Sequence, residues 1–184
     1  MVQSVVIDAN IFFHMWILDP ILTLADEGLF EPLWSDAIME EVARNLPKVW
    51  KEVTVSQISS FLAVVNESYP YAKVPDWREN MEGLELPDPD DCHVLAAAIA
   101  AEAASIITLN LADFPQDVAS RYDVKIEHPD DFLCRIYDGN PQAADVAIRR
   151  MIENKKHPPR TLAEEYAGLD KVGLHKFARR IATG

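Results

Sequence analysis

Short apolar runs alternate with helical stretches along this chain, and this alternation is the strongest constraint on its fold. Residues 4–7 and 105–108 are rich in β-branched side chains and are each followed by polar residues, so both predict buried strands. Residues 29–34 and 124–126 predict two more, and Pro32 favours an edge position for the first of them. Strands that alternate with helices predict βαβ units. We therefore expect an α/β fold with a mainly parallel sheet of about four or five strands, flanked by helices.

Helical periodicity and capping residues give the expected helices between these strands. Asn10, Ser35 and Asp88 have the residue types of N-caps, while Gly28 and Pro47 predict helix ends. The expected helices are 11–18, 20–27, 36–46, one that Thr54 or Ser56 opens and that runs to 65, 89–101, 141–154, 161–167, 174–181 and one that begins at 129.

The alternation of strands and helices stops near residue 139, and the chain changes from acidic to basic soon afterwards. We expect an α/β domain over residues 1–138 and a C-terminal helical appendage over 139–184. The whole chain has a formal net charge of −13. Residues 149–184 alone hold nine Lys and Arg against four Asp and Glu, so an acidic body carries a basic tail.

The cysteines and the N-terminus indicate the compartment. Cys92 and Cys134 are the two cysteines, and they form neither a CxxC pair nor a disulfide framework. The start of the chain lacks the basic region of a signal peptide, and the longest apolar run, residues 94–101, is too short to span a bilayer. We expect a cytoplasmic protein with no membrane contact.

Acidic residues cluster where ligands bind in a parallel α/β sheet, beyond the carboxyl ends of the strands. Asp8 follows the first strand, Asp113 follows the third, and Asp90 and Asp91 open the helix before it, while Glu41 lies on a helix that can pack beside them. Mg²⁺ and Mn²⁺ prefer such oxygen ligands. Any one of these acids alone is more simply explained as a cap or turn residue, but the ordered set predicts a metal site.

Other chemistries fit less well. A haloacid dehalogenase-type phosphatase needs a second Asp two residues after the first, where this chain has Asn10. The six glycines form no GxGxxG or P-loop. Cys92 and His93 are neighbours on a helix and do not face each other, so a thiol–imidazole pair is not expected. Cys92 is expected in the core, and His93 at most at the edge of the site.

Four segments carry a resemblance to a known family. They are residues 6–10 (VIDAN), 35–42 (SDAIMEEV), 88–98 (DPDDCHVLAAA) and 108–114 (TLNLADF). In this order they resemble the four motifs of the PIN-domain family, over roughly residues 1–135. The resemblance implies a three-layer PIN-like fold and Mg²⁺- or Mn²⁺-dependent hydrolysis of RNA phosphodiester bonds. Many such proteins are VapC-like toxins of toxin–antitoxin pairs. The implied partners are thus RNA, a cognate antitoxin and a second copy of the chain.

Carried over residue by residue, the resemblance makes Asp8, Glu41 and Asp91 the core acids of the site, with Asp90 as an alternative to Asp91. The fourth motif departs from the family pattern, because Asn110 stands where many relatives have Asp. Asp113 is expected to supply that carboxylate, although Asn110 could also serve through its carbonyl. The groups expected to orient the carboxylates are Asn10, Asp90, Thr108 and Asn110.

Two further interpretations stay open. The basic residues Arg149, Arg150, Lys155 and Lys156 could bind the RNA backbone or could form a solvated helix face. The non-enzyme alternative is a catalytically weak PIN-like binding module. In that case the acidic crevice and the aromatic residues of 47–85 engage a protein partner.

Overall fold

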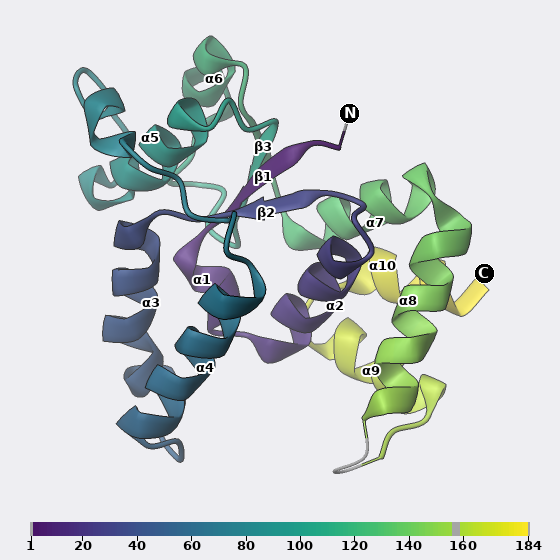
Figure 1. The fold of residues 1–184 in the computed structure, drawn as a ribbon. Coiled ribbons are helices and arrows are strands. Elements are labelled where there is room, and N and C mark those ends of the chain that lie inside the picture. Colours follow the sequence, from purple (N-terminus) through teal and green to yellow (C-terminus); the bar gives the residue numbers. More distant parts are fainter. Residues whose placement is uncertain (1, 156–158, 184) are drawn as a thin grey trace.

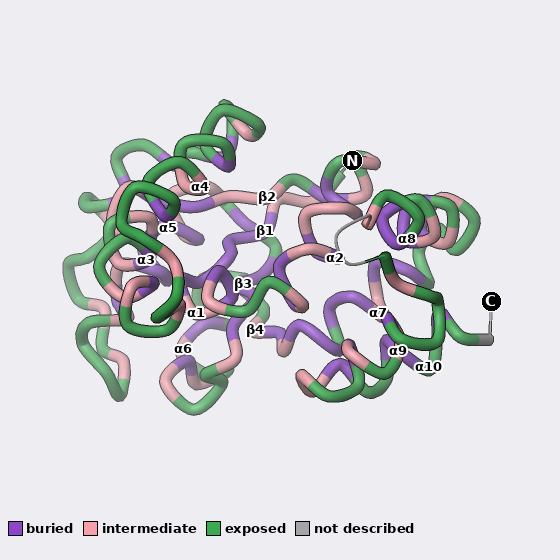
Figure 2. The backbone as a smooth tube through the Cα atoms, turned by 90° about the horizontal axis from the view of Figure 1, so that it is seen from below, coloured by how far each residue is buried: buried purple, intermediate pink, exposed green. Residues whose placement is uncertain are grey.

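Four parallel strands form the centre of the protein, in a computed structural model that describes residues 2–155 and 159–183. Their spatial order is β2-β1-β3-β4 (Figures 1 and 2). The strands are β1 (Ser4–Ile7), β2 (Glu31–Leu33), β3 (Ser105–Ile107) and β4 (Lys125–Glu127). The predicted α/β class and the edge position of β2 are confirmed. Because all pairs are parallel, with Val6 opposite both Leu33 and Ile106, the strands end at a common edge.

Helices cover the sheet on both sides, as three layers require. The helices are α1 (Ala9–Phe12), α2 (Met15–Asp26), α3 (Asp36–Val49), α4 (Val55–Ser68), α5 (Cys92–Ala100), α6 (Gln116–Ala119), α7 (Pro129–Gly139), α8 (Pro141–Asn154), α9 (Leu162–Lys171) and α10 (His175–Thr183). Both ribbon and tube views place α3, α4, α5 and α6 on one side, and α2, α7, α8, α9 and α10 on the other (Figures 1 and 2).

Several helix boundaries differ from those expected. The chain leaves β1 straight into α1, whose N-cap is Asp8, so Asn10 is not a cap and its side chain is free to bond elsewhere. The helix break falls at Phe13–His14, and α2 runs through Pro20 without restarting. Helix α3 likewise continues past Pro47 to Val49, since a proline so near the end removes only one intrahelical bond.

The core lies where apolar strands and the alanine-rich helix meet. In β1 the side chains of Val5, Val6 and Ile7 are fully buried, and so is every residue of 94–98 in α5 (Figure 2). The prediction of a buried helix there is confirmed, and Cys92 is buried with it. Small side chains let α5 approach β1 and β3 closely. This packing fixes the start of α5 next to the carboxyl ends of both strands.

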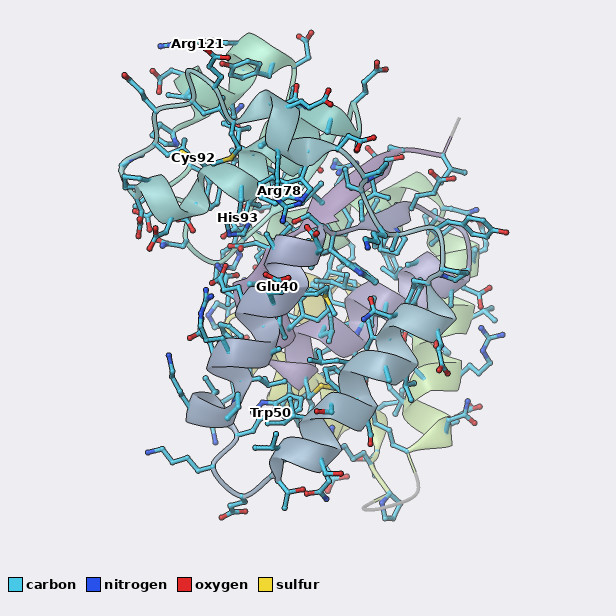
Figure 3. The ribbon with its side chains drawn as sticks, turned by 60° about the vertical axis from the view of Figure 1, so that its left-hand side comes forward. Glu40, Trp50, Arg78, Cys92, His93 and Arg121 are labelled. Atoms are coloured by element: carbon cyan, nitrogen blue, oxygen red, sulfur yellow. The ribbon has the colours of Figure 1, made fainter. Side chains whose placement is uncertain are left out.

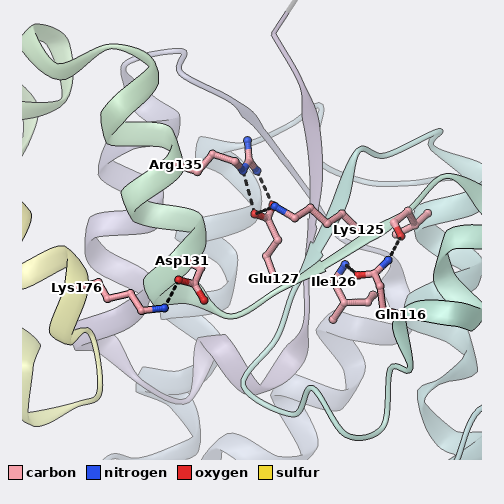
Figure 4. Close-up of polar contacts among 8 residues, drawn as sticks. Gln116, Lys125, Ile126, Glu127, Asp131, Arg135 and Lys176 are labelled. Atoms are coloured by element: carbon pink, nitrogen blue, oxygen red, sulfur yellow. Dashed lines mark hydrogen bonds and ion pairs between the residues drawn. The ribbon is translucent and has the colours of Figure 1, made fainter.

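The last helices are tied to the α/β body by buried polar contacts. Asp130 of α7 accepts the backbone N–H groups of Lys176 (3.0 Å) and Phe177 (2.8 Å), and thereby caps α10. Nearby, Lys176 also pairs with Asp131 (Figure 4). The division of the chain at residues 138/139 stays a prediction. Within the described residues, no helix has the length and apolar character needed to cross a bilayer.

Candidate active site

Asp8 follows β1 at the carboxyl edge of the sheet and is buried, with 4% of its surface exposed. Its Oδ2 accepts hydrogen bonds from Thr108 Oγ1 (2.7 Å) and from Asn10 Nδ2 (2.5 Å). Asn10 is held in turn, because its Oδ1 accepts the backbone N–H of Leu109 at 3.1 Å. The ends of β1 and β3 therefore fix this carboxylate, and Asn10 and Thr108 contact it directly.

Asp91 lies in the 3-10 turn η2 (Pro89–Asp91) that leads into α5. The turn is capped by Asp88, whose side chain accepts the backbone N–H of Asp90 at 2.9 Å, so the predicted Asp88 cap is confirmed. Asp90 is exposed, whereas Asp91 is partly buried. Asp91 also interacts electrostatically with Asp8, so Asp91 is better placed than Asp90 to share a site with Asp8.

Burial and mutual repulsion raise the pKa values of Asp8 and Asp91. Burial first, and then the negative charges of Asp8, Asp88, Asp113 and Glu41, together raise the pKa of Asp91 to about 7. Burial likewise raises the pKa of Asp8 to about 6, opposed by the Thr108 hydrogen bond and helped by the charge of Glu41. The four predicted acids thus share one electrostatic neighbourhood, which a cation would stabilise.

Glu41 reaches this neighbourhood from α3, and a histidine contacts it there. Nε2 of His93, in the first turn of α5, lies 3.3 Å from Oε2 of Glu41. The ring of His93 also makes an edge contact with Trp77, with centroids 6.1 Å apart. Figure 3 shows His93 and Arg78 near the N-terminal end of α3. His93 was expected only at the edge of the site, yet it touches one of its acids.

Asn110 and Asp113 form a small turn after β3. The side-chain amide of Asn110 donates to the carboxylate of Asp113, and its backbone N–H donates to Thr108 Oγ1 at 3.0 Å. Asp113 is close enough for its charge to raise the pKa of Asp91, after the larger effects of burial, Asp8 and Asp88. Asn110, which departs from the family pattern, therefore binds Asp113, the acid that could take its place as the fourth carboxylate.

The basic residues predicted to bind RNA are in ion pairs. Arg149 pairs with Asp145 at 2.7 Å, Arg150 pairs with Glu27, and Lys155 pairs with Asp19 (2.8 Å) and Glu165 (2.5 Å). Lys156 lies outside the described residues.

The aromatic residues of 47–85 are mostly internal. Trp50 Nε1 donates to the carbonyl of Phe13, Tyr69 bonds to α2, and Trp77 is buried. Tyr71, by contrast, is 93% exposed. Most of the proposed aromatic docking surface is therefore core or helix-to-helix packing.

The donor chemistry suits a hard divalent cation, since the candidate ligands are carboxylate oxygens from four separate segments. In the described part of the chain, no three His, Cys, Asp or Glu side chains already converge closely enough to hold an ion. Such spacing lowers the repulsion between the acids, because two carboxylates about 4 Å apart repel by about 4 kcal/mol at an effective dielectric near 20. The residues therefore fit a divalent cation in the type of their donor atoms.

Comparison with family models shows the class of protein. A model described as PIN domain matches residues 4–112, more than half of the chain, so this chain belongs to the PIN-domain family. The resemblance carried by the four motifs is thereby confirmed. A second model, described as VapC50 C-terminal domain, matches residues 129–183, from the start of α7 to the end of α10.

One curated relative is similar to part of the chain. The "Putative ribonuclease VapC50" of Mycobacterium tuberculosis (strain ATCC 25618 / H37Rv) is 42% identical over 83 residues. The matched stretch covers 45% of this chain and spans about half the length of that relative, 47%. No solved structure matches the chain.

Proposed function

We propose that this chain is a metal-dependent endoribonuclease that hydrolyses RNA phosphodiester bonds and acts as the toxin of a toxin–antitoxin pair. One observation carries the chemistry: carboxylates from four separate segments share the carboxyl edge of the sheet, and two of them have pKa values raised to about 6 and about 7. Membership of the PIN-domain family and the name of the VapC50 relative support RNA as the substrate.

Asp8, Glu41, Asp91 and Asp113 would hold Mg²⁺ or Mn²⁺. When bound, such an ion supplies Lewis acidity, which favours ionisation of a water molecule and stabilises negative charge on the phosphate. The protein's own contribution is positioning. Thr108 and Asn10 hold Asp8, and Asn110 holds Asp113, so that little side-chain motion remains to be lost when the site closes. No carboxylate acts as a covalent nucleophile in this proposal.

The proposed partners follow from the family. An antitoxin would bind the toxin and block its site, and the chain would form a homodimer in the cytoplasm. RNA contact by Arg149, Arg150, Lys155 and Lys156 also stays a prediction. The ion pairs of the first three do not support it. Substitution of Arg149 and Arg150 by Ala tests it, because loss of two phosphate contacts lowers the salt dependence of RNA affinity by about two units.

Cleavage of an RNA transcript is the direct test. Wild type and Asp8→Asn are compared with Mg²⁺, with Mn²⁺ and with EDTA. We expect cleavage by the wild type only with metal, and a loss of at least about 100-fold in Asp8→Asn. Equal cleavage in all conditions would remove the proposal.

A binding module without catalysis is the second candidate. Asn110 in place of a common acid and the spacing of the carboxylates favour it, whereas the internal position of Trp50, Tyr69 and Trp77 weakens it. Calorimetric titration with Mn²⁺ separates the two, since a pure binding module needs no metal.

A further inference from the structure

The imidazole of His93 is held between an acid of the site and a buried indole. Its Nε2 is 3.3 Å from Glu41 Oε2, and the side chains of His93 and Glu41 are 16% and 24% exposed. On another edge the ring meets Trp77, at an interplanar angle of 63°. Because Glu41 and Trp77 contact different edges of the imidazole, the orientation of the ring is defined.

The hydrogen-bonding capacity of the two groups assigns the proton. A carboxylate only accepts, so the hydrogen of a neutral imidazole must lie on Nε2 for the pair to bond. The other nitrogen, Nδ1, is buried and has no hydrogen-bond partner in the described part of the chain. A bare nitrogen lone pair is tolerated there more readily than an orphaned N–H donor. Both observations favour donation from Nε2–H to Glu41.

The same turn that packs on His93 is anchored to the start of α3. Trp77, in η1 (Trp77–Asn80), donates its Nε1–H to Asp36 Oδ1 at 2.6 Å. Arg78 stacks its guanidinium on the Trp77 ring, 4.3 Å from the centroid, and pairs with the same Asp36. Helix α3 is therefore tied twice: at Asp36 through Trp77, and at Glu41 through His93.

We propose that His93 is a positioning residue of the active site, which holds Glu41 Oε2 through its Nε2–H and leaves Oε1 free for a divalent cation. This inference rests on the proposed function. Glu41 needs such a partner more than Asp8 does, because a glutamate on a helix flank has several free rotatable bonds, whereas Asp8 is fixed by two strand ends. The Trp77 ring limits the orientations of the His93 imidazole, so the group that positions Glu41 is itself fixed in place.

A packing role and a hydrogen-bonding role predict different responses to substitution. In Gln the amide nitrogen is as many bonds from Cβ as Nε2 is in His, whereas in Asn it corresponds to Nδ1. His93→Gln therefore keeps a donor within reach of Glu41, and His93→Asn does not. The two variants are matched in chemistry, and thermal unfolding in EDTA identifies any variant that fails to fold.

Mn²⁺ affinity measured by calorimetry without RNA is the readout. We expect His93→Asn to bind Mn²⁺ about 10- to 100-fold more weakly than wild type, as for other groups that orient metal ligands. His93→Gln should stay close to wild type. In a Glu41→Gln background, His93→Asn should cause little further loss, because the residue through which it acts is already altered.

Several outcomes would overturn the inference. They are equal Mn²⁺ affinity in wild type and His93→Asn, equal loss in His93→Gln and His93→Asn, or full additivity with Glu41→Gln. Failure of the proposed function looks different: the wild type would then bind no Mn²⁺, or would bind it and cleave no RNA. If the wild type binds Mn²⁺ but cleaves no RNA, the Mn²⁺ affinities of the His93 variants still test the positioning role of His93.

Discussion

Gly168 of α9 lies against the indole of Trp16 on α2, so closely that a β-carbon at position 168 would overlap the ring. The guanidinium of Arg160 stacks on the same ring, 3.9 Å from its centroid, and restricts its movement. Gly168 is thus a point of very close approach between α9 and α2.

Gly168→Ala should therefore lower the free energy of unfolding by about 1–3 kcal/mol, as overpacking does. The clash outweighs the gain of up to about 1 kcal/mol that Ala brings to a helix interior. Gly139→Ala is the control, because a β-carbon there meets nothing within 4 Å. Urea unfolding of both variants measures the difference. Equal stability of the two would show that Trp16 moves aside freely.

The Glu127–Arg135 pair should stabilise the junction between β4 and α7. The carboxylate is buried and accepts from Arg135 Nε (2.9 Å) and Nη2 (2.5 Å), with Lys125 beside it (Figure 4). Burial alone would raise the pKa of Glu127, but these hydrogen bonds lower it on balance. Arg135→Met should thus destabilise the protein by about 2–4 kcal/mol at pH 7, since it leaves a buried charge with one partner fewer.

The sign of the pH dependence follows from that lowered pKa. The stabilisation is present above the unfolded pKa of Glu127 and is lost as the pH falls through the folded value. The difference between wild type and Arg135→Met should hence shrink below about pH 4. Arg121→Met is the matched control, because Arg121 pairs with Asp117 on the surface at 3.8 Å and should matter by less than about 0.5 kcal/mol. A difference that persists at low pH would contradict the account.

Stability without metal should rise as the pH falls from about 8 to about 5. Asp8 and Asp91 have folded pKa values raised to about 6 and about 7, so the folded state binds more protons than the unfolded chain in this range. In EDTA at pH 8, Asp8→Asn should melt no lower than wild type, because it removes a buried charge. A clearly lower melting temperature would mean that Asp8 has a structural role.

Asp113 should be the fourth acid of the site. Asp113→Asn is expected to weaken Mn²⁺ binding by about 10-fold or more, because it removes a carboxylate near Asp91. Asp117→Asn is the control, since Asp117 lies on the surface and pairs with Arg121. Calorimetry measures both. Wild-type affinity in Asp113→Asn, together with a loss in Asn110→Ala, would assign the fourth ligand to Asn110 instead.

Periodicity and composition predict the strands, a mainly parallel sheet and the buried helix α5, because those signals are local. Contacts between distant segments were beyond them. The local pattern predicts Asn10 as a helix cap, yet its amide bonds to Thr108, 98 residues away; only the family resemblance predicts a role for both residues beside the carboxylates. The contact of His93 with Glu41 was missed for the same reason, since Glu41 comes from another helix. The charge of the C-terminal tail predicts RNA contact, whereas Arg149, Arg150 and Lys155 pair with acids in the folded protein.

Anomalous diffraction from crystals soaked in Mn²⁺ tests the central claim most directly, because it locates the ion itself. We expect a peak bounded by carboxylate oxygens of Asp8, Glu41 and Asp91, with oxygen–metal distances of about 2.0–2.3 Å. A peak elsewhere, or none at a concentration that supports RNA cleavage, would contradict the account.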